Sequence, residues 1–154
     1  MSLFEKKTKD DYTVIIGCGR LGASLADTLS EMGCNVLILD SNKESFRKLS
    51  PDFGGLSVVG DGTDLDTLQE AEVAKATAVI VVTNNDNTNI LISQICREIF
   101  KVKAVISRLY DPERECVYQE FDIDTICPAV LSVKEIDKLL SGMPRQQEVS
   151  QEAI

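Results

Sequence analysis

The sequence has 154 residues, of which 44% are hydrophobic and 27% charged, so it is long enough to bury the core of one ordinary globular domain. Sixteen basic against twenty-five acidic residues give a net charge of −9, which disfavours binding to the phosphates of nucleic acids. No apolar stretch approaches the roughly 18 residues that span a bilayer, and residues 1–11 lack the apolar segment of a signal peptide, so we expect a cytoplasmic protein without direct membrane insertion.

Short β-branched segments alternate with helical segments in the first half of the chain. Residues 12–16 are typical of a buried parallel strand, and the helix that follows is expected to end at Gly33. The predicted core face of that helix consists of Leu21, Leu25, Leu29 and Met32. The next predicted elements are a strand at residues 36–39, a helix at 43–49 capped by Ser41 or Asn42, a strand at 56–59 and a helix capped by Thr63.

The second half of the chain continues this alternation. Residues 76–82 are too short and too β-branched for a buried helix, so we predict a fourth strand there. An Asn-rich turn at residues 83–89 precedes a helix whose expected core face contains Leu91, Ile92, Ile95, Cys96, Ile99 and Phe100. The remaining predicted elements are a strand at 104–106, a helix that starts at Asp111 and Pro112, a strand at 123–126 and a helix at 130–140.

Six strands with helices between them predict an α/β fold. We expect a Rossmann-type, doubly wound, six-stranded parallel sheet in three α/β/α layers, with a ligand crevice at the carboxyl ends of the strands. Residues 12–140 are predicted to form this domain, with an N-terminal extension at residues 1–11 and a polar tail or linker at residues 141–154.

A glycine-rich turn follows the first predicted strand and opens the first predicted helix. It reads Gly17-Cys18-Gly19-Arg20-Leu21-Gly22. In such a fingerprint Gly17 allows the tight turn, Gly19 lets a pyrophosphate approach the backbone, and Gly22 lets the helix pack close to the strand. The helix N-terminus attracts anions, and Arg20 adds a positive charge. The alternative is a purely structural turn, which the strand, the helix and the acid that follow disfavour.

Asp40 ends the second predicted strand, where an acid hydrogen-bonds the ribose hydroxyls of an adenosine and repels a 2′-phosphate. This pattern favours NAD(H), ATP, ADP or AMP as the cofactor and disfavours NADP. The alternative is that Asp40 only caps the helix that begins near Lys43. At the end of the third predicted strand, Asp61 between Gly60 and Gly62 is equally compatible with an adenine contact and with a simple Asp-Gly turn.

Polar residues also follow the fourth and fifth predicted strands. Thr83, Asn84 and Asp86 lie where a Rossmann crevice holds the far half of its ligand, although Asn and Asp also favour turns and caps. Arg108 ends the fifth predicted strand and suggests a contact with an anion.

Groups that would perform catalysis are missing from the sequence. There is no histidine, neither Tyr110 nor Tyr118 has a lysine four residues later, and no serine lies in a G-x-S-x-G turn. The five cysteines form no C-x-x-C pair, so we predict neither a zinc site nor a disulfide framework. We expect a site that holds a nucleotide without transforming it. The alternatives are a small NAD-dependent oxidoreductase and a nucleotide-free scaffold used only for assembly.

Taken together, the motifs resemble the RCK/KTN family. The resemblance covers about residues 12–140 and rests on Gly17-Cys18-Gly19-Arg20-Leu21-Gly22, Leu39-Asp40, Val59-Gly60-Asp61-Gly62-Thr63, Thr83-Asn84-Asn85-Asp86-Asn87 and Ser107-Arg108. Members of this family are the nucleotide-binding regulatory domains of Trk/Ktr potassium uptake systems and of potassium channels. They usually continue into a smaller C-terminal ligand-binding domain, for which we find no counterpart in this sequence.

The resemblance implies a role for each matching position. It implies phosphate contacts at Gly19, Arg20, Leu21 and Gly22, a ribose contact at Asp40, adenine contacts at Ser41, Gly60, Asp61 and Gly62, crevice-lining positions at Thr83 and Asn84, and a phosphate contact at Arg108 within this subunit or to a neighbouring one. It further implies a regulatory subunit that forms homodimers and then rings. Such a subunit would lie at the inner face of the cell membrane through a membrane-embedded potassium transporter or channel, and nucleotide binding would gate ion flux.

Overall fold

The computed structural model describes residues 10–143, and six parallel strands form its single sheet. The strands are β1 (Tyr12–Ile16), β2 (Asn35–Asp40), β3 (Leu56–Val59), β4 (Ala78–Val81), β5 (Ala104–Arg108) and β6 (Asp124–Ile126). Their order is β3-β2-β1-β4-β5-β6, so the chain changes direction across the sheet between β1 and β4. In doubly wound sheets a crevice opens at such a switch point, at the carboxyl ends of the strands. The predicted Rossmann-type fold is confirmed.

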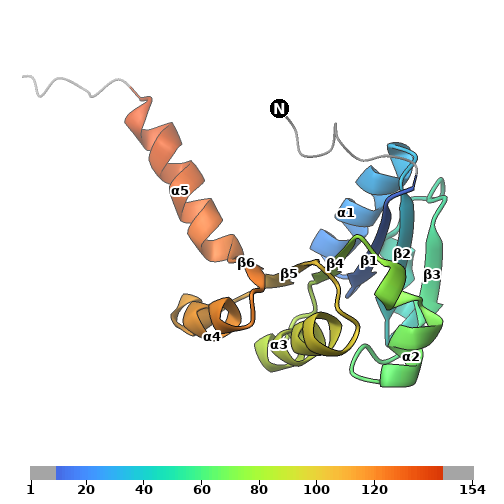
Figure 1. Ribbon diagram of the computed structural model, residues 1–154. Helices are drawn as coiled ribbons and strands as arrows, with labels where there is room; N and C mark the ends of the chain where they lie inside the picture. Colours follow the sequence, from blue (N-terminus) through green and yellow to red (C-terminus); the bar gives the residue numbers. More distant parts are fainter. Residues whose placement is uncertain (1–9, 144–154) are drawn as a thin grey trace, which may run out of the picture.

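Helices connect these strands (Figure 1). They are α1 (Arg20–Glu31), the 3₁₀ helix η2 (Lys43–Lys48), α2 (Leu65–Glu70), the 3₁₀ turn η3 (Val73–Lys75), α3 (Asp86–Gln94), the π-helical turn η4 (Ile95–Ile99), the 3₁₀ turn η5 (Pro112–Arg114), α4 (Glu115–Glu120) and α5 (Pro128–Ser141). As predicted, Gly33 follows α1 with a positive φ of 76° and Asn42 caps the segment after β2.

The sheet buries apolar residues on both of its faces, as expected for parallel strands covered by helices. On one face Ile15, Ile38 and Ile80 pack with the small residues of α1. On the other face a larger core that includes Val14 and Val79 packs against α2, α3 and α4. The three α/β/α layers follow from these two cores.

The predicted core face of α1 is only partly correct: Leu29 is buried and Leu25 packs half-buried against the core, but the other two predicted residues are exposed. Leu21 and Met32 are 36% and 44% exposed, whereas Gly22, Ala23, Ala26 and Leu29 are buried. The reason is the close approach of α1 to the glycine turn: a Cβ at Gly22 would lie only 1.9 Å from the carbonyl oxygen of Gly17. This contact brings the start of α1 close to the sheet, so the small residues Gly22, Ala23 and Ala26 face it there, and Leu29 is buried further along the helix.

Two predicted helix boundaries were wrong. Asp64, not Thr63, caps α2 by accepting a hydrogen bond from the amide of Asp66 at 3.0 Å. The Asn-rich turn is also shorter than predicted, because α3 already begins at Asp86. Asn85 caps this helix by accepting from the amide of Thr88 at 3.0 Å. The asparagine-rich segment therefore forms the N-cap and the first turn of α3.

The predicted core face of the helix after this cap is only partly correct. Ile92 and Cys96 are buried, but Leu91 and Ile99 are 45% and 57% exposed. A regular helix would keep one face along its whole length, and the π-helical turn η4 interrupts that periodicity before Ile99.

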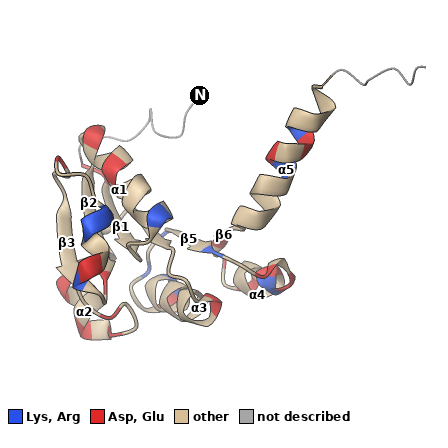
Figure 2. Cartoon of the chain, turned by 180° about the vertical axis from the view of Figure 1, so that it is seen from behind, with Lys and Arg blue, Asp and Glu red and all other residues tan. Residues whose placement is uncertain are grey.

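Helix α5 projects away from the rest of the chain in both orientations shown (Figures 1 and 2). It begins at Pro128 rather than at residue 130, and none of its residues is buried. Residues 1–9 and 144–154 of the predicted extension and tail lie outside the described residues. Among the described residues, no helix combines the length and the apolar character needed to cross a membrane.

Candidate functional site

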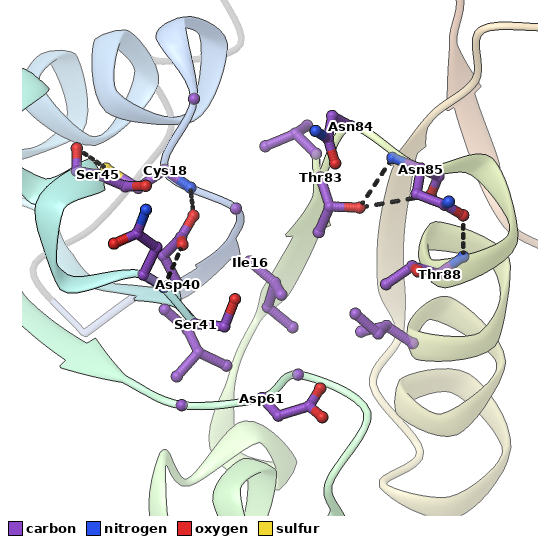
Figure 3. Close-up of a pocket in the computed structure, with 18 of the residues that line it drawn as sticks. Ile16, Cys18, Asp40, Ser41, Ser45, Asp61, Thr83, Asn84, Asn85 and Thr88 are labelled. Atoms are coloured by element: carbon purple, nitrogen blue, oxygen red, sulfur yellow. Dashed lines mark hydrogen bonds between the residues drawn. The ribbon is translucent and has the colours of Figure 1, made fainter.

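A cavity of about 500 Å³ opens at the carboxyl ends of the strands. Most of the predicted site residues line it: Gly17, Gly19, Asp40, Ser41, Gly60, Asp61, Gly62, Thr83, Asn84 and Arg108. Figure 3 shows Asp40 and Ser41 on one side of this cavity and Thr83, Asn84 and Asn85 on the other. Arg20, Leu21 and Gly22 are not among the lining residues: the first two are exposed at the start of α1, and Gly22 is buried beneath them.

The glycine turn packs closely against the ends of β2 and β4. Gly17 has a φ of 108°, which favours glycine, and its amide donates to the carbonyl of Leu39 at 2.8 Å. A Cβ at Gly17 would lie 2.8 Å from the backbone nitrogen of Thr83. By contrast, a Cβ at Gly19 would meet no atom within 4 Å. The backbone at Gly19 is therefore open toward the cavity, at the N-cap of α1.

Asp40 joins the glycine turn to the end of β2. Its Oδ2 accepts from the amide of Cys18 at 2.7 Å and its Oδ1 accepts from the amide of Asn42 at 2.8 Å (Figure 3). The side chain that caps η2 is that of Asn42, which accepts from the amide of Glu44 at 3.1 Å. A carboxylate offers about four acceptor positions, so Asp40 keeps acceptors for the hydroxyls of a ligand.

Asp61 stands at the rim of the cavity, at the end of β3. Its Oδ1 accepts from both the amide and the hydroxyl of Thr63, at 2.8 and 2.7 Å. These bonds lower the pKa of Asp61 from its ordinary value, so the carboxylate stays charged at neutral pH. The flanking glycines also serve packing, since a Cβ at Gly60 would lie 2.6 Å from Thr67 and one at Gly62 would lie 2.8 Å from Ile16.

The far wall of the cavity is built by the ends of β4 and β5. The amide of Thr83 donates to Asn89, and the guanidinium of Arg108 donates from Nη2 to the carbonyl of Thr83 at 2.6 Å. Asp86 faces the loop after β5, because its two carboxylate oxygens accept from the amides of Tyr110 and Asp111 at 2.9 and 3.1 Å. Asp86 therefore fixes this loop and does not line the cavity.

Several lining residues were not predicted from the sequence. The polar ones are Cys18, Asn42, Ser45, Lys48, Asn85 and Thr88. Cys18 is fully buried, and its thiol donates to the carbonyl of Ser45 at 3.4 Å. Desolvation and the nearby Asp40 raise the pKa of this thiol. The sequence signal for Lys48 is its position on the helix that follows Asp40, and the signal for Asn85 is helix capping.

Metal binding finds no support within residues 10–143, where no group of three or more cysteine, aspartate and glutamate side chains is placed to hold a metal ion. The cysteines in this range are all free thiols.

Comparison with known proteins adds an independent line of evidence. The family model of the TrkA-N domain matches residues 13–128. The Trk system potassium uptake protein TrkA of Streptomyces coelicolor is 44% identical over 75% of this chain and 52% of its own length. A TrkA homologue of Methanothermobacter thermautotrophicus is 30% identical over 84% of this chain and 60% of its own length. The chain thus spans little more than half the length of these relatives.

Solved structures show the same fold. The GsuK channel bound to NAD shares 26% identity at a TM-score of 0.73, over 88% of this chain and 24% of that one. GsuK bound to ADP shares 27% identity at a TM-score of 0.72, over 87% and 35% of the two chains. The TrkA-N domain of the inner membrane protein ybaL from Escherichia coli shares 17% identity at a TM-score of 0.76, over 84% and 96%.

Proposed function

The chain belongs to the TrkA-N domain family, and from this premise we propose that it is a cytoplasmic regulatory subunit of a potassium uptake transporter or channel. In this proposal it binds NAD(H) or an adenine nucleotide, and the bound ligand gates ion flux. The relatives are Trk potassium uptake proteins, which supports the potassium system, and the similar GsuK structures are bound to NAD and to ADP, which supports the class of ligand.

The observation that carries the proposal is the open backbone at Gly19 beside the carboxylate of Asp40. A phosphate can approach the N-terminus of α1 at Gly19 without meeting a side chain, and the amides and the helix dipole there favour an anion. Asp40 lies at the adjacent end of β2 with acceptors for ribose hydroxyls. The two groups stand at the places where a Rossmann site holds phosphate and ribose.

The same geometry guides the choice among nucleotides. The negative charge of Asp40 repels a 2′-phosphate, so we propose NAD(H), ATP, ADP or AMP and disfavour NADP. On the adenine side we propose Ser41, Gly60, Asp61 and Gly62, which line the cavity next to Asp40. Arg108 is proposed to contact phosphate from the far wall. Arg20 and Leu21 are proposed to act through their backbone amides at the start of α1.

We propose that the site senses its ligand and does not transform it. The sequence has no histidine for acid–base work. The side chains that line the cavity include carboxylates, two basic groups, hydroxyls and amides, all of which can hold a nucleotide through charge and hydrogen bonds. Regulation then requires that the ligand bind one conformation of the assembly better than another, with a typical coupling of about 1–3 kcal/mol.

We further propose a homodimer that assembles into a ring at the inner face of the membrane, and the surface of α5 supports the self-association in this proposal. Most of this helix carries neither acidic nor basic residues (Figure 2), and its exposed apolar side chains are Val130, Leu131, Val133, Ile136, Leu139 and Leu140. Exposed apolar surface of this kind marks sites of protein association. The membrane-embedded subunit is proposed as the further partner of that assembly.

Titration calorimetry tests the proposed ligand class. We expect at least one of NADH, NAD, ATP, ADP and AMP to give a binding isotherm, and we expect NADPH to bind more weakly than NADH. Replacement of Asp40 by alanine should weaken binding at least about tenfold, since hydrogen bonds to a charged group are lost. Absence of binding by all of these nucleotides at millimolar concentration would contradict the proposal.

A further inference from the structure

Asn89 is a fully buried polar side chain in the first half of α3, and its amide group is completely hydrogen-bonded. Its Oδ1 accepts from the amide of Thr83 at 3.0 Å and also from the hydroxyl of Thr83. Its Nδ2 donates to the carbonyls of Thr83 and Arg108, each at 3.1 Å. The two acceptor and two donor positions of the amide are all used.

The partners of Asn89 are two residues that line the cavity. Thr83 is at the end of β4 and Arg108 is at the end of β5. β5 stays tied to β6 beyond this point, since the amide of Leu109 donates to the carbonyl of Ile126 at 2.8 Å, but it needs a separate link to the end of β4. Asn89 supplies that link from behind the cavity wall, because its one buried side chain donates to the carbonyls of both Thr83 and Arg108.

The carbonyl of Thr83 also connects Asn89 to the guanidinium of Arg108. This oxygen accepts from Nδ2 of Asn89 and from Nη2 of Arg108, the latter at 2.6 Å. On its other side the guanidinium stacks over the ring of Tyr110, with 4.8 Å between its carbon and the ring centre. The Nε of Arg108 is buried and has no hydrogen-bond partner among the described residues. A buried charged donor of this kind calls for an acceptor.

We propose that Asn89 is a positioning residue of the nucleotide site: it holds the carbonyl of Thr83 in the place that directs Arg108 toward an anionic oxygen of the ligand. This inference rests on the proposed nucleotide binding and adds a residue that does not itself line the cavity. The phosphate-bearing part of the ligand is the part that Asn89 affects. The competing view is that Asn89 only stabilises the fold.

The test compares Asn89→Ala with Ser93→Ala in the full chain. Ser93 is the matched control, because it lies one turn later on α3, is equally buried, and its hydroxyl has no hydrogen-bond partner among the described residues. Calorimetry measures the binding of ADP and of adenosine, which lacks phosphate. For Asn89→Ala we expect the affinity for ADP to fall at least about tenfold and the affinity for adenosine to change less than about twofold. Ser93→Ala should leave both affinities unchanged.

A double variant separates positioning from a direct effect. Arg108→Met removes the guanidinium that Asn89 is proposed to position. The double variant should therefore bind ADP no more weakly than Arg108→Met alone, because the effects of two groups that act through one another do not add. Additive losses in the double variant would overturn the proposal. So would an equal loss of ADP and adenosine binding in Asn89→Ala, which is the result that a purely structural role predicts.

Folding is checked by thermal unfolding of each variant, and binding is measured below the midpoint. If Asn89→Ala does not fold, Asn89→Ser, which keeps a polar group at the position, takes its place. We expect the same result for it: a large loss of affinity for ADP and a small one for adenosine. Failure of both variants to fold would overturn the positioning role. The two failures can be told apart. If the unchanged protein binds no adenine nucleotide, the proposed function fails. If it binds ADP but Asn89→Ala weakens ADP and adenosine equally, only the positioning role of Asn89 fails.

Discussion

Replacement of Gly19 by alanine should weaken phosphate binding while leaving the fold intact. Gly19 has a φ of −79° and a ψ of −166°, a conformation that alanine adopts readily. The new Cβ would meet no protein atom within 4 Å, so it would occupy only space that belongs to the cavity. The gain from a less flexible unfolded chain, about 0.4–1 kcal/mol, roughly offsets the loss of glycine at a helix N-cap. We expect the free energy of unfolding to change by less than about 1 kcal/mol.

The ligand, in contrast, loses the close approach to the backbone amides at the start of α1. Hydrogen bonds to a charged group contribute about 1.5–3 kcal/mol, so affinity for ADP should fall about tenfold to a hundredfold in calorimetry. Gly22→Ala is the matched contrast, since its Cβ would lie 1.9 Å from the carbonyl oxygen of Gly17 and would force the backbone apart. That change should cost about 1–3 kcal/mol or more of folding free energy. Unchanged ADP binding by Gly19→Ala would show that the phosphate does not lie against the backbone at Gly19.

Three further predictions concern other parts of the chain. Asp40→Ala leaves the buried amide of Cys18 without its acceptor, so the free energy of unfolding in urea should fall by about 1–3 kcal/mol. Asp52→Ala, at an exposed carboxylate, should change it very little, and equal losses in the two variants would contradict this prediction. Burial raises the pKa of the Cys96 thiol from 9.0 to about 12. Between these values only the unfolded chain loses the proton, so the free energy of unfolding should fall as the pH rises above 9. Cys96→Ala should make this pH dependence less steep, and an unchanged dependence would contradict the prediction. Charged replacements at Val133 and Ile136 on α5 should weaken self-association in sedimentation, and an unchanged dimer would exclude this face from the interface.

The order of strands and helices could be predicted because local patterns determine it. Each strand is a short β-branched run, Gly33 ends its helix with a positive φ, and the glycine turn lies between a strand and a helix. Asp40 and Asp61 reach the same cavity because parallel strands bring their carboxyl ends to one edge of the sheet. These features need only the sequence and the rules of the doubly wound fold.

The remaining details depend on contacts between distant segments. The close packing of the start of α1 follows from the contact of Gly22 with Gly17, which helical periodicity does not contain, so the exposure of Leu21 was not predicted. Asn89 was assigned to a turn because Asn-rich segments favour turns, although its role is to join β4 and β5. Only the packing of α3 against the ends of both strands explains why an asparagine is buried there.

A crystal structure of this chain grown with ADP is the most direct test of the proposed site. We expect phosphate oxygens within hydrogen-bond distance of the backbone amides at Gly19 to Leu21, and ribose hydroxyls on the carboxylate of Asp40. ADP bound elsewhere on the chain, with the glycine turn and Asp40 making no contact to it, would contradict the account.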